Sequence, residues 1–528
     1  MKKRVLGIML SLTMAMTSLG GALSVSAAEE SQKTITMAMS SSWENLVTFD
    51  STSVYASQIF DLLYDRLIYT RNDGTYEPML ADSWEMNDDN TVLTFHLKKD
   101  ATWQDGEPIT AKDVEFTCKL IAAPSLAAAR AVAFDWIKGY GESDDSLEVN
   151  VVDDYTVEFT CAQPTTLEYL MFTKLNGVYI LPEHILGGMS YDEVRNSDYW
   201  QNPVGAGAAV YDSEISGERI EFTANKDFCL GAPDWDRLVI RIVPTSNLLA
   251  GLKNGEIDAV NGNSAAIPLS DWEMAQEDEN LDTHAITGVA YQYMSINTQK
   301  DYLNETVRQA INMAIDRDTI INGLLKGEGE AICGPYASNH AYKDPEIQPQ
   351  YDPEKAKELL DEAGWDSSRE LVFSVPTGNT VREQSAVIIQ QNLQAIGINT
   401  KIETADFATH MDKVRKGDYD LGLFGSAGSP EPSECVINFQ PGQLNNFAQL
   451  TDDTLYNIGK KGENVFTHEE RYACYDEFQK ALTEIVPWVF LYAPKDLVAF
   501  NKRLGNTTVG EGDSLIVNQN VWEWTVNE

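Results

Sequence analysis

The clearest pattern of apolar and polar positions lies in Leu80–Phe116, which reads LADSWEMNDDNTVLTFHLKKDATWQDGEPITAKDVEF. Three apolar residues alternate with polar ones after the Asn-Asp-Asp-Asn turn, which predicts the second strand of a hairpin with one buried face. These residues are Leu93, Phe95 and Leu97. Further on, an Asp-Gly pair predicts a turn, and Thr110 with Asp113 predicts a capping box. The stretch therefore predicts a hairpin and then a helix.

A βαβ unit is predicted later in the chain. Leu238–Val243 is an almost continuous apolar run, which predicts a buried strand, and a helix over Ser246–Lys253 and a strand over Gly255–Val260 follow. The next loop, Asn261–Ala265, lies beyond the carboxyl end of a strand, where open α/β sheets bind ligands. Nearer the N-terminus we expect a strand over Thr34–Met39 and a helix from about Tyr55 to Leu67.

The last third of the chain alternates strands with helices, which predicts parallel pairing. The elements are Leu371–Val375, Arg382–Ile396, Thr400–Thr404, Phe407–Lys416 and Tyr419–Phe424. Before them, Asp318 is expected to cap a helix that Gly327 ends, and Asp352 with Pro353 is expected to begin another. A further strand is expected over Leu497–Phe500, after the segment Val486–Pro494.

Composition and the N-terminus narrow the class of protein. The chain has 528 residues, enough for two or three domains, and its net charge of −42 argues against nucleic acid as a partner. Three basic residues precede the apolar run Val5–Leu23, and small residues at 25–28 follow, which predicts a signal peptide cleaved after Ala27 or Ala28. We therefore expect export to the periplasm, cell envelope or exterior. No lipid-anchor cysteine follows the run.

The order LADSW, strand, W-x-DG and TAKDV-F resembles the signature of family 5 extracellular solute-binding proteins of ABC importers, a group that includes oligopeptide-, dipeptide- and nickel-binding proteins. Residues 80–116, 237–260, 305–327 and 351–365 carry the resemblance most strongly. It implies an α/β, two-lobed periplasmic-binding-protein-like type II fold with an additional small α+β domain. The implied boundaries are 1–28 for the signal peptide, 29–75, 196–297 and 497–528 for lobe I, 76–195 for the small domain, and 298–496 for lobe II.

The resemblance also implies a function. Such a protein captures a peptide or a similar small polar solute in an interlobe cleft and delivers it to a permease driven by an ATPase. It would do so as a monomer, without a cofactor and without catalysis. An oligosaccharide- or metal-chelate-binding importer component is the alternative, and a secreted hydrolase or a ligand sensor that acts through a receptor are more distant ones.

Loop position and the resemblance together suggest which residues face the ligand. The candidates are Trp43, Trp136, Asn263, Tyr291, Tyr293 and, within Gly425–Glu431, Ser426, Ser429 and Glu431. Each candidate also has a structural interpretation, since aromatic residues usually fill cores. Tyr291 and Tyr293 alternate on one predicted strand, so they share a face.

The segment Phe424–Pro432, FGSAGSPEP, departs from the family pattern. In peptide-binding relatives an aspartate near here pairs with the amino terminus of the ligand, and alignment places Gly428 or Ser429 at that position. A buried ammonium without a carboxylate is costly, so a peptide would need Glu431 or Glu434 as the substitute. The missing aspartate is the reason to keep oligosaccharide and metal chelate as alternatives.

Motifs for catalysis and metal binding are absent from the sequence. The six histidines never fall at H-E-x-x-H spacing, and there is no G-x-S-x-G elbow or P-loop. Gly205-x-Gly207 lacks the third glycine and helix of a nucleotide site. The six cysteines form no C-x-x-C motif. Disulfides between Cys118 and Cys161 or between Cys333 and Cys435 remain open beside buried free thiols.

Overall fold

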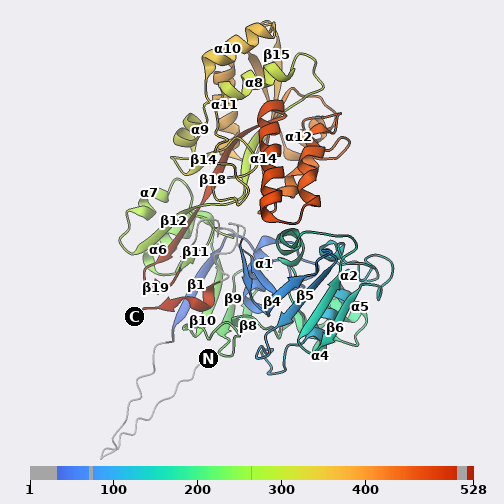
Figure 1. The fold of residues 1–528 in the computed structure, drawn as a ribbon. Helices are drawn as coiled ribbons and strands as arrows, with labels where there is room; N and C mark the ends of the chain where they lie inside the picture. The colour runs from blue at the N-terminus through green and yellow to red at the C-terminus, as the bar shows by residue number, and fades with distance from the viewer. Residues whose placement is uncertain (1–31, 71–74, 263, 508–519, 528) are drawn as a thin grey trace, which may run out of the picture. The chain divides into compact units, whose positions relative to one another are not determined.

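The computed structural model describes residues 32–70, 75–262, 264–507 and 520–527 (Figure 1). The expected signal peptide, residues 1–28, and Asn263 lie outside them. Twelve strands form one mixed sheet in the order β16-β15-β17-β13-β18-β11-β1-β10-β9-β8, with β12 and β14 paired to β18. A separate four-stranded sheet has the order β4-β5-β7-β6. None of the described helices is both long enough and apolar enough to span a bilayer.

One half of the large sheet contains the predicted βαβ unit. Strand β1 (Thr34–Met39) lies between β10 (Arg237–Ile242) and β11 (Ala259–Val260) and is parallel to both, and α6 (Leu248–Asn254) connects the outer two. Burial along β10 alternates, which corrects the expectation of a nearly continuous buried strand, because only one face of this part of the sheet is covered. Antiparallel strands β9 (Arg219–Ala224) and β8 (Ala209–Ile215) complete this side.

The other half of the sheet confirms the predicted parallel pairing. Strand β15 (Glu370–Pro376) pairs in parallel with β16 (Asn399–Ala405) and β17 (Leu421–Ser426). Its helices are α8 (Glu305–Ala314), α9 (Arg317–Leu324), α10 (Pro353–Glu362), α11 (Thr380–Ala395), α12 (Phe407–Arg415), α13 (Thr454–Lys460) and α14 (His468–Ile485). The N-cap of α9 is Asp316, which accepts a hydrogen bond from the Thr319 backbone at 2.9 Å, so the prediction of Asp318 was wrong by half a turn.

Strand β18 (Trp488–Asn501) belongs to both halves of the large sheet (Figure 1). Its first part pairs with β13 (Tyr291–Ile296) and β14 (Gly329–Ala331), and its second part with β12 (Leu281–Thr287) and β11. The strand predicted over Leu497–Phe500 is the second part of this longer strand. Pro494 does not break the strand, because the φ of proline is compatible with extended backbone and partner strands continue on both sides of it.

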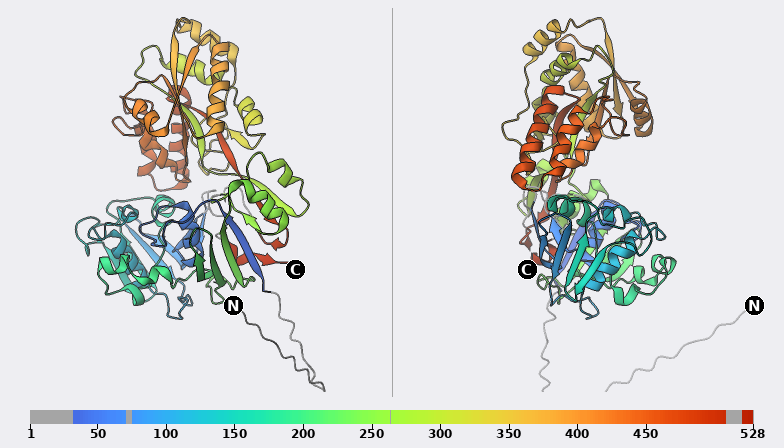
Figure 2. Two further views of the ribbon diagram at one scale, coloured as in Figure 1. Left: turned by 180° about the vertical axis from the view of Figure 1, so that it is seen from behind. Right: turned by 45° about the vertical axis from the view of Figure 1, so that its right-hand side comes forward.

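The four-stranded sheet confirms the prediction made from the opening pattern. It consists of β4 (Ala81–Met86), β5 (Val92–Leu97), β7 (Thr156–Thr160) and β6 (Val149–Asp153), all antiparallel. Helix α2 (Ala111–Ala122) packs on β6 and β7 (Figures 1 and 2). The Thr110 backbone N–H donates to Asp113 at 2.8 Å in the expected capping box. Phe95 and Phe159 meet edge to face in its core, with ring centroids 5.9 Å apart.

Helix α1 (Val54–Leu63) ends four residues before the predicted Leu67. The Leu63 carbonyl accepts a hydrogen bond from the backbone of Gly207 at 2.9 Å instead of continuing the helix. A Cβ on Gly205 would lie 1.8 Å from the same carbonyl oxygen. The glycine-rich turn is thus explained by close backbone approach to the end of α1.

The remaining helices and strands are short. The short elements are β2 (Ile68–Thr70), β3 (Tyr76–Pro78), α3 (Leu167–Tyr169), α4 (Glu183–Leu186), α5 (Tyr191–Arg195), α7 (Trp272–Gln276), β19 (Leu504–Gly505) and β20 (Thr525–Val526). All six cysteines are free, so neither of the two cysteine pairs considered from the sequence forms a disulfide. Buried Cys118 and Cys161 are therefore free thiols, the second of the two expected alternatives.

Candidate functional site

A small pocket of about 80 Å³ lies where β13, the end of β17 and the following segment meet. Its lining residues are Tyr291, Pro335, Tyr336, Ser426, Gly428, Ser429, Glu431, Glu434, Cys435 and Asn438. Four of the residues expected to face a ligand, Tyr291, Ser426, Ser429 and Glu431, thus come together at one place. Tyr291 and Ser426 are direct partners in the pairing of β13 with β17. We call this the Glu431 pocket.

Gly428 fixes the shape of the loop at the pocket. It has a φ of +68°, and a Cβ there would lie 1.7 Å from the carbonyl oxygen of Val289. Its backbone N–H donates to Ser426 Oγ at 3.1 Å. No side chain fits at position 428 without moving the backbone, so an aspartate cannot take this position in the loop as it is folded here.

Glu431 is buried, and its two carboxylate oxygens have different surroundings. Oε1 accepts hydrogen bonds from Arg471 Nη2 at 2.6 Å and from the Ser433 backbone at 3.1 Å. Oε2 is buried and has no hydrogen-bond partner among the described residues. Burial raises the pKa of Glu431, and the guanidinium of Arg471 opposes that rise. The neighbouring Glu434 is exposed, and none of the described residues forms an ion pair with it.

His340 holds the backbone at the pocket in place. Its Nδ1 accepts from the Tyr342 backbone N–H at 3.1 Å, so the ring proton is on Nε2, which donates to the Ser429 carbonyl at 3.0 Å. The ring stacks on Tyr336 with centroids 4.4 Å apart. Burial lowers the pKa of His340 to about 4, so the imidazole is neutral at physiological pH.

Arg471 joins Glu431 to a second carboxylate, that of Glu168. Arg471 Nη1 donates a hydrogen bond to Glu168 Oε2 at 2.6 Å, and the Tyr342 hydroxyl donates a hydrogen bond to the same oxygen. His468 Nδ1 lies 3.0 Å from Glu168 Oε1. Burial alone would raise the pKa of Glu168, but the hydrogen bond from Tyr342 and the charge of Arg471 outweigh it and lower the pKa. This cluster could not be predicted from the sequence, because an isolated arginine or glutamate is not part of any motif.

A larger pocket of about 790 Å³ lies beside this cluster. One wall comes from residues 163–173 and the other from residues 433–471, and Arg471 and Glu434 belong to its lining. Glu434 lines the Glu431 pocket as well, so the two cavities share one carboxylate. Ile437 and Phe466, both partly exposed, add apolar surface. We call this the Phe466 pocket.

The other residues expected at the ligand lie elsewhere. Tyr293 is buried behind Tyr291 and stacks on Trp488 with centroids 4.0 Å apart. Trp43 is buried, donates its indole N–H to Glu214 at 3.3 Å and lines a separate pocket of about 520 Å³. Trp136 is buried against Phe159 and donates to the Ala133 carbonyl at 3.0 Å. Asn263 lies outside the described residues.

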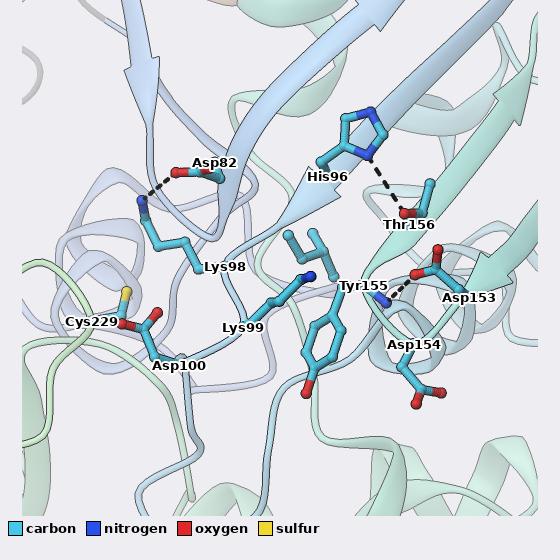
Figure 3. Close-up of a pocket in the computed structure, with 11 residues that line it drawn as sticks. Asp82, His96, Lys98, Lys99, Asp100, Asp153, Asp154, Tyr155, Thr156 and Cys229 are labelled. Carbon is cyan, nitrogen blue, oxygen red and sulfur yellow. Dashed lines mark hydrogen bonds and ion pairs between the residues drawn. The ribbon is translucent and has the colours of Figure 1, made fainter.

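A further pocket of about 730 Å³ lies on the four-stranded sheet and is lined by several charged side chains (Figure 3). Lys98 lies 3.7 Å from Asp82, and the Tyr155 backbone donates to Asp153 at 2.8 Å. None of the residues expected at the ligand lines it. Among the described residues, no group of three or more His, Cys, Asp or Glu side chains is arranged to hold a metal ion.

Comparisons with known proteins match most of the chain. The family model for bacterial extracellular solute-binding proteins, family 5, matches residues 75–446. The oligopeptide-binding protein AppA of Bacillus subtilis is 26% identical over 478 residues, covering 86% of this chain and 85% of AppA. Heme-binding protein A of Haemophilus influenzae is 27% identical over 463 residues, covering 83% of each chain.

Solved structures agree over almost the whole length. The ABC transporter substrate-binding protein CtaP of Listeria monocytogenes superposes with a TM-score of 0.82 at 22% identity, covering 94% of this chain and all of CtaP. NikZ of Campylobacter jejuni, in complex with Ni(L-His), gives a TM-score of 0.71 at 26% identity, covering 93% of this chain and 99% of NikZ. The similarity therefore includes both halves of the large sheet and the four-stranded sheet.

Proposed function

Because the chain belongs to the bacterial extracellular solute-binding proteins, family 5, we propose that it captures a peptide carrying a free amino terminus for an ABC importer. The α/β fold of type II periplasmic binding proteins, expected from the sequence, is confirmed by the structures that share it. The expected division into lobe I (29–75, 196–297, 497–528), a small domain (76–195) and lobe II (298–496) is part of the proposal. The Glu431 pocket then belongs to lobe II, except for Tyr291, which falls within 196–297 of lobe I.

The observation that supports an amine is the orphan oxygen of Glu431. A buried carboxylate oxygen without a donor is costly, and a protonated amine supplies both a donor and a charge. Glu434 adds a second carboxylate to the same pocket, and no lysine or arginine lines it. The pocket therefore favours a cationic group, and Tyr291, Ser426 and Ser429 would surround it.

The Phe466 pocket offers space for the rest of the solute. It shares Glu434 with the Glu431 pocket, so a chain that begins at the carboxylates could continue past Glu434. The names of the relatives give three ligands, since AppA is an oligopeptide-binding protein, a second relative is heme-binding protein A and NikZ holds Ni(L-His). A metal chelate is therefore the second candidate.

The remaining parts of the proposal follow from the family. The protein is exported, with residues 1–28 as the signal peptide, binds its solute as a monomer and passes it unchanged to a permease and its ATPase. The relatives named above are binding proteins, which supports a role without catalysis.

Calorimetry with trialanine, N-acetyl-trialanine and Ni(L-His) tests the proposal. We expect trialanine to bind and its acetylated form to bind at least tenfold more weakly, because a hydrogen bond to a charged group contributes about 1.5–3 kcal/mol. In the double variant Glu431→Gln/Glu434→Gln this preference should disappear, whereas Glu142→Gln, an exposed position in the small domain, should behave like the wild type. Undiminished preference for trialanine in the folded double variant would refute the role of these carboxylates. Binding of Ni(L-His) alone would favour the chelate.

A further inference from the structure

Glu168 is the centre of a contact between two distant parts of the chain. Its carboxylate is bound by Tyr342, His468 and Arg471, which lie 174, 300 and 303 positions away in sequence. Glu168 is in the short helix α3, after the last strand of the four-stranded sheet, whereas its three partners come from the loop after β14 and from α14. In the proposed division, this contact joins the small domain to lobe II.

The other hydrogen bonds of Arg471 come from its own lobe. The side chain of Arg471 is 2% exposed, and contacts within its own lobe hold it: Glu431 at 2.6 Å and the Gly462 carbonyl at 3.2 Å. Its guanidinium also lies over the ring of Tyr342, 5.4 Å from the centroid. Because these contacts restrict the guanidinium of Arg471, it loses little conformational freedom when it binds a second carboxylate.

One guanidinium therefore serves two carboxylates. Arg471 Nη2 binds Glu431 in the Glu431 pocket, and Arg471 Nη1 binds Glu168 across the contact, each at 2.6 Å. While His468 is neutral and no further cation is bound, the two carboxylates share the one positive charge of Arg471. A cationic group bound at Glu431 Oε2 would balance the second negative charge and strengthen the pairing of Arg471 with Glu168. Thermodynamic linkage requires the reverse as well, so the Glu168 contact strengthens binding of the cation.

We propose that Glu168 is a latch that holds the small domain against lobe II, and that Arg471 couples this latch to the presence of a cationic group in the Glu431 pocket. The latch closes one edge of the Phe466 pocket, because residues 163–173 and 433–471 form its opposite walls. Glu168 itself lines neither pocket, so its effect on binding is indirect. The latch stands on contacts within the chain alone, whereas its coupling to a cation rests on the proposed function.

Hydrogen exchange with mass spectrometry tests the latch in the full chain without any solute. In Glu168→Gln we expect faster exchange of backbone amides in residues 163–173 and in the first turn of α14, with unchanged exchange in β5 and β15. The matched control is Glu142→Gln, which removes an exposed carboxylate of the same domain. His468→Ala, at a side chain that is 55% exposed, removes one of the three contacts and should give a smaller effect in the same segments. Equal exchange in Glu168→Gln and Glu142→Gln would overturn the latch.

Calorimetry with trialanine tests the coupling. We expect Glu168→Gln to weaken trialanine binding about 5- to 150-fold, the usual range of coupling between two sites, and Glu142→Gln to leave it unchanged. Equal affinities in wild type and Glu168→Gln would overturn the coupling and leave peptide capture intact. If trialanine binds none of the three proteins, the proposed peptide function and the coupling both fail, and the exchange result still decides the latch.

Discussion

Replacing Arg471 by Met should destabilise the protein strongly, because it leaves a buried carboxylate without its counter-ion. The side chain of Glu431 is 0% exposed, and its pairing with Arg471 is at 2.6 Å. Removing one partner of a buried pair costs about 3–5 kcal/mol of unfolding free energy. Replacing both partners, Arg471→Met with Glu431→Leu, removes the unpaired charge at Glu431 but still loses the contacts of Arg471 with Glu168 and the Gly462 carbonyl, so the double variant should be more stable than Arg471→Met and less stable than the wild type.

Urea unfolding at pH 7.5, followed by circular dichroism and tryptophan fluorescence, measures these differences. Lys480→Met is the control on the same helix, since that side chain is 57% exposed and its pair with Asp476 should contribute less than about 1 kcal/mol. The loss in Arg471→Met should shrink as the pH falls, because Glu431 is then protonated in the folded protein. A double variant as unstable as Arg471→Met, or an Arg471→Met variant as stable as the control, would refute the role assigned to this pair.

Three further predictions concern other parts of the chain. Gly205→Ala should lower the unfolding free energy by about 3 kcal/mol, because the new Cβ meets the Leu63 carbonyl. Gly323→Ala in α9, with open space around its Cβ, should raise the unfolding free energy by about 1 kcal/mol. Urea unfolding that ranks the two variants the other way contradicts the packing described. Burial raises the pKa of Asp65 from 3.8 to about 8, so the stability that its protonated form contributes is complete below pH 3.8 and is lost as the pH rises through 8. Asp65→Asn should therefore flatten the dependence of the unfolding free energy on pH between pH 6 and 9. An unchanged slope would exclude this carboxyl as the source of that dependence. Asp352→Ala removes the N-cap of α10, where Oδ1 accepts from the Lys355 backbone at 2.8 Å, and should cost about 1 kcal/mol in thermal unfolding; no loss would mean that the cap is dispensable.

Local patterns predicted many of the elements, and they failed where distant partners decide. The hairpin of β4 and β5 and the parallel pairing of β15 follow from patterns within one segment, and both predictions were confirmed. Helix α1 ends early because its last carbonyl is bound by Gly207, more than a hundred residues away. Strand β18 is continuous because partner strands from two parts of the chain support it, and no property of its own sequence reports this.

The candidate site was predicted in part. Tyr291, Ser426, Ser429 and Glu431 share one pocket, as expected from adjacent strands and a loop, although their contact with a ligand stays a prediction. Sequence reasoning missed Arg471, because it reaches Glu431 only through the packing of α14. The aromatic candidates were the hardest to judge. Whether a tryptophan lines a cleft or fills a core depends on packing that the local pattern does not contain.

Strand β18 has a consequence for how the chain matures during synthesis. It lies in the middle of the large sheet, between β13 and β11, yet it comes at residues 488–501 of 528. Until this segment leaves the ribosome, both neighbouring strands keep an open edge, so neither half of the sheet can finish early. The large sheet therefore stays incomplete until residues 488–501 have been synthesised, and a stop codon placed before position 488 would yield a chain without the strand that joins its two halves.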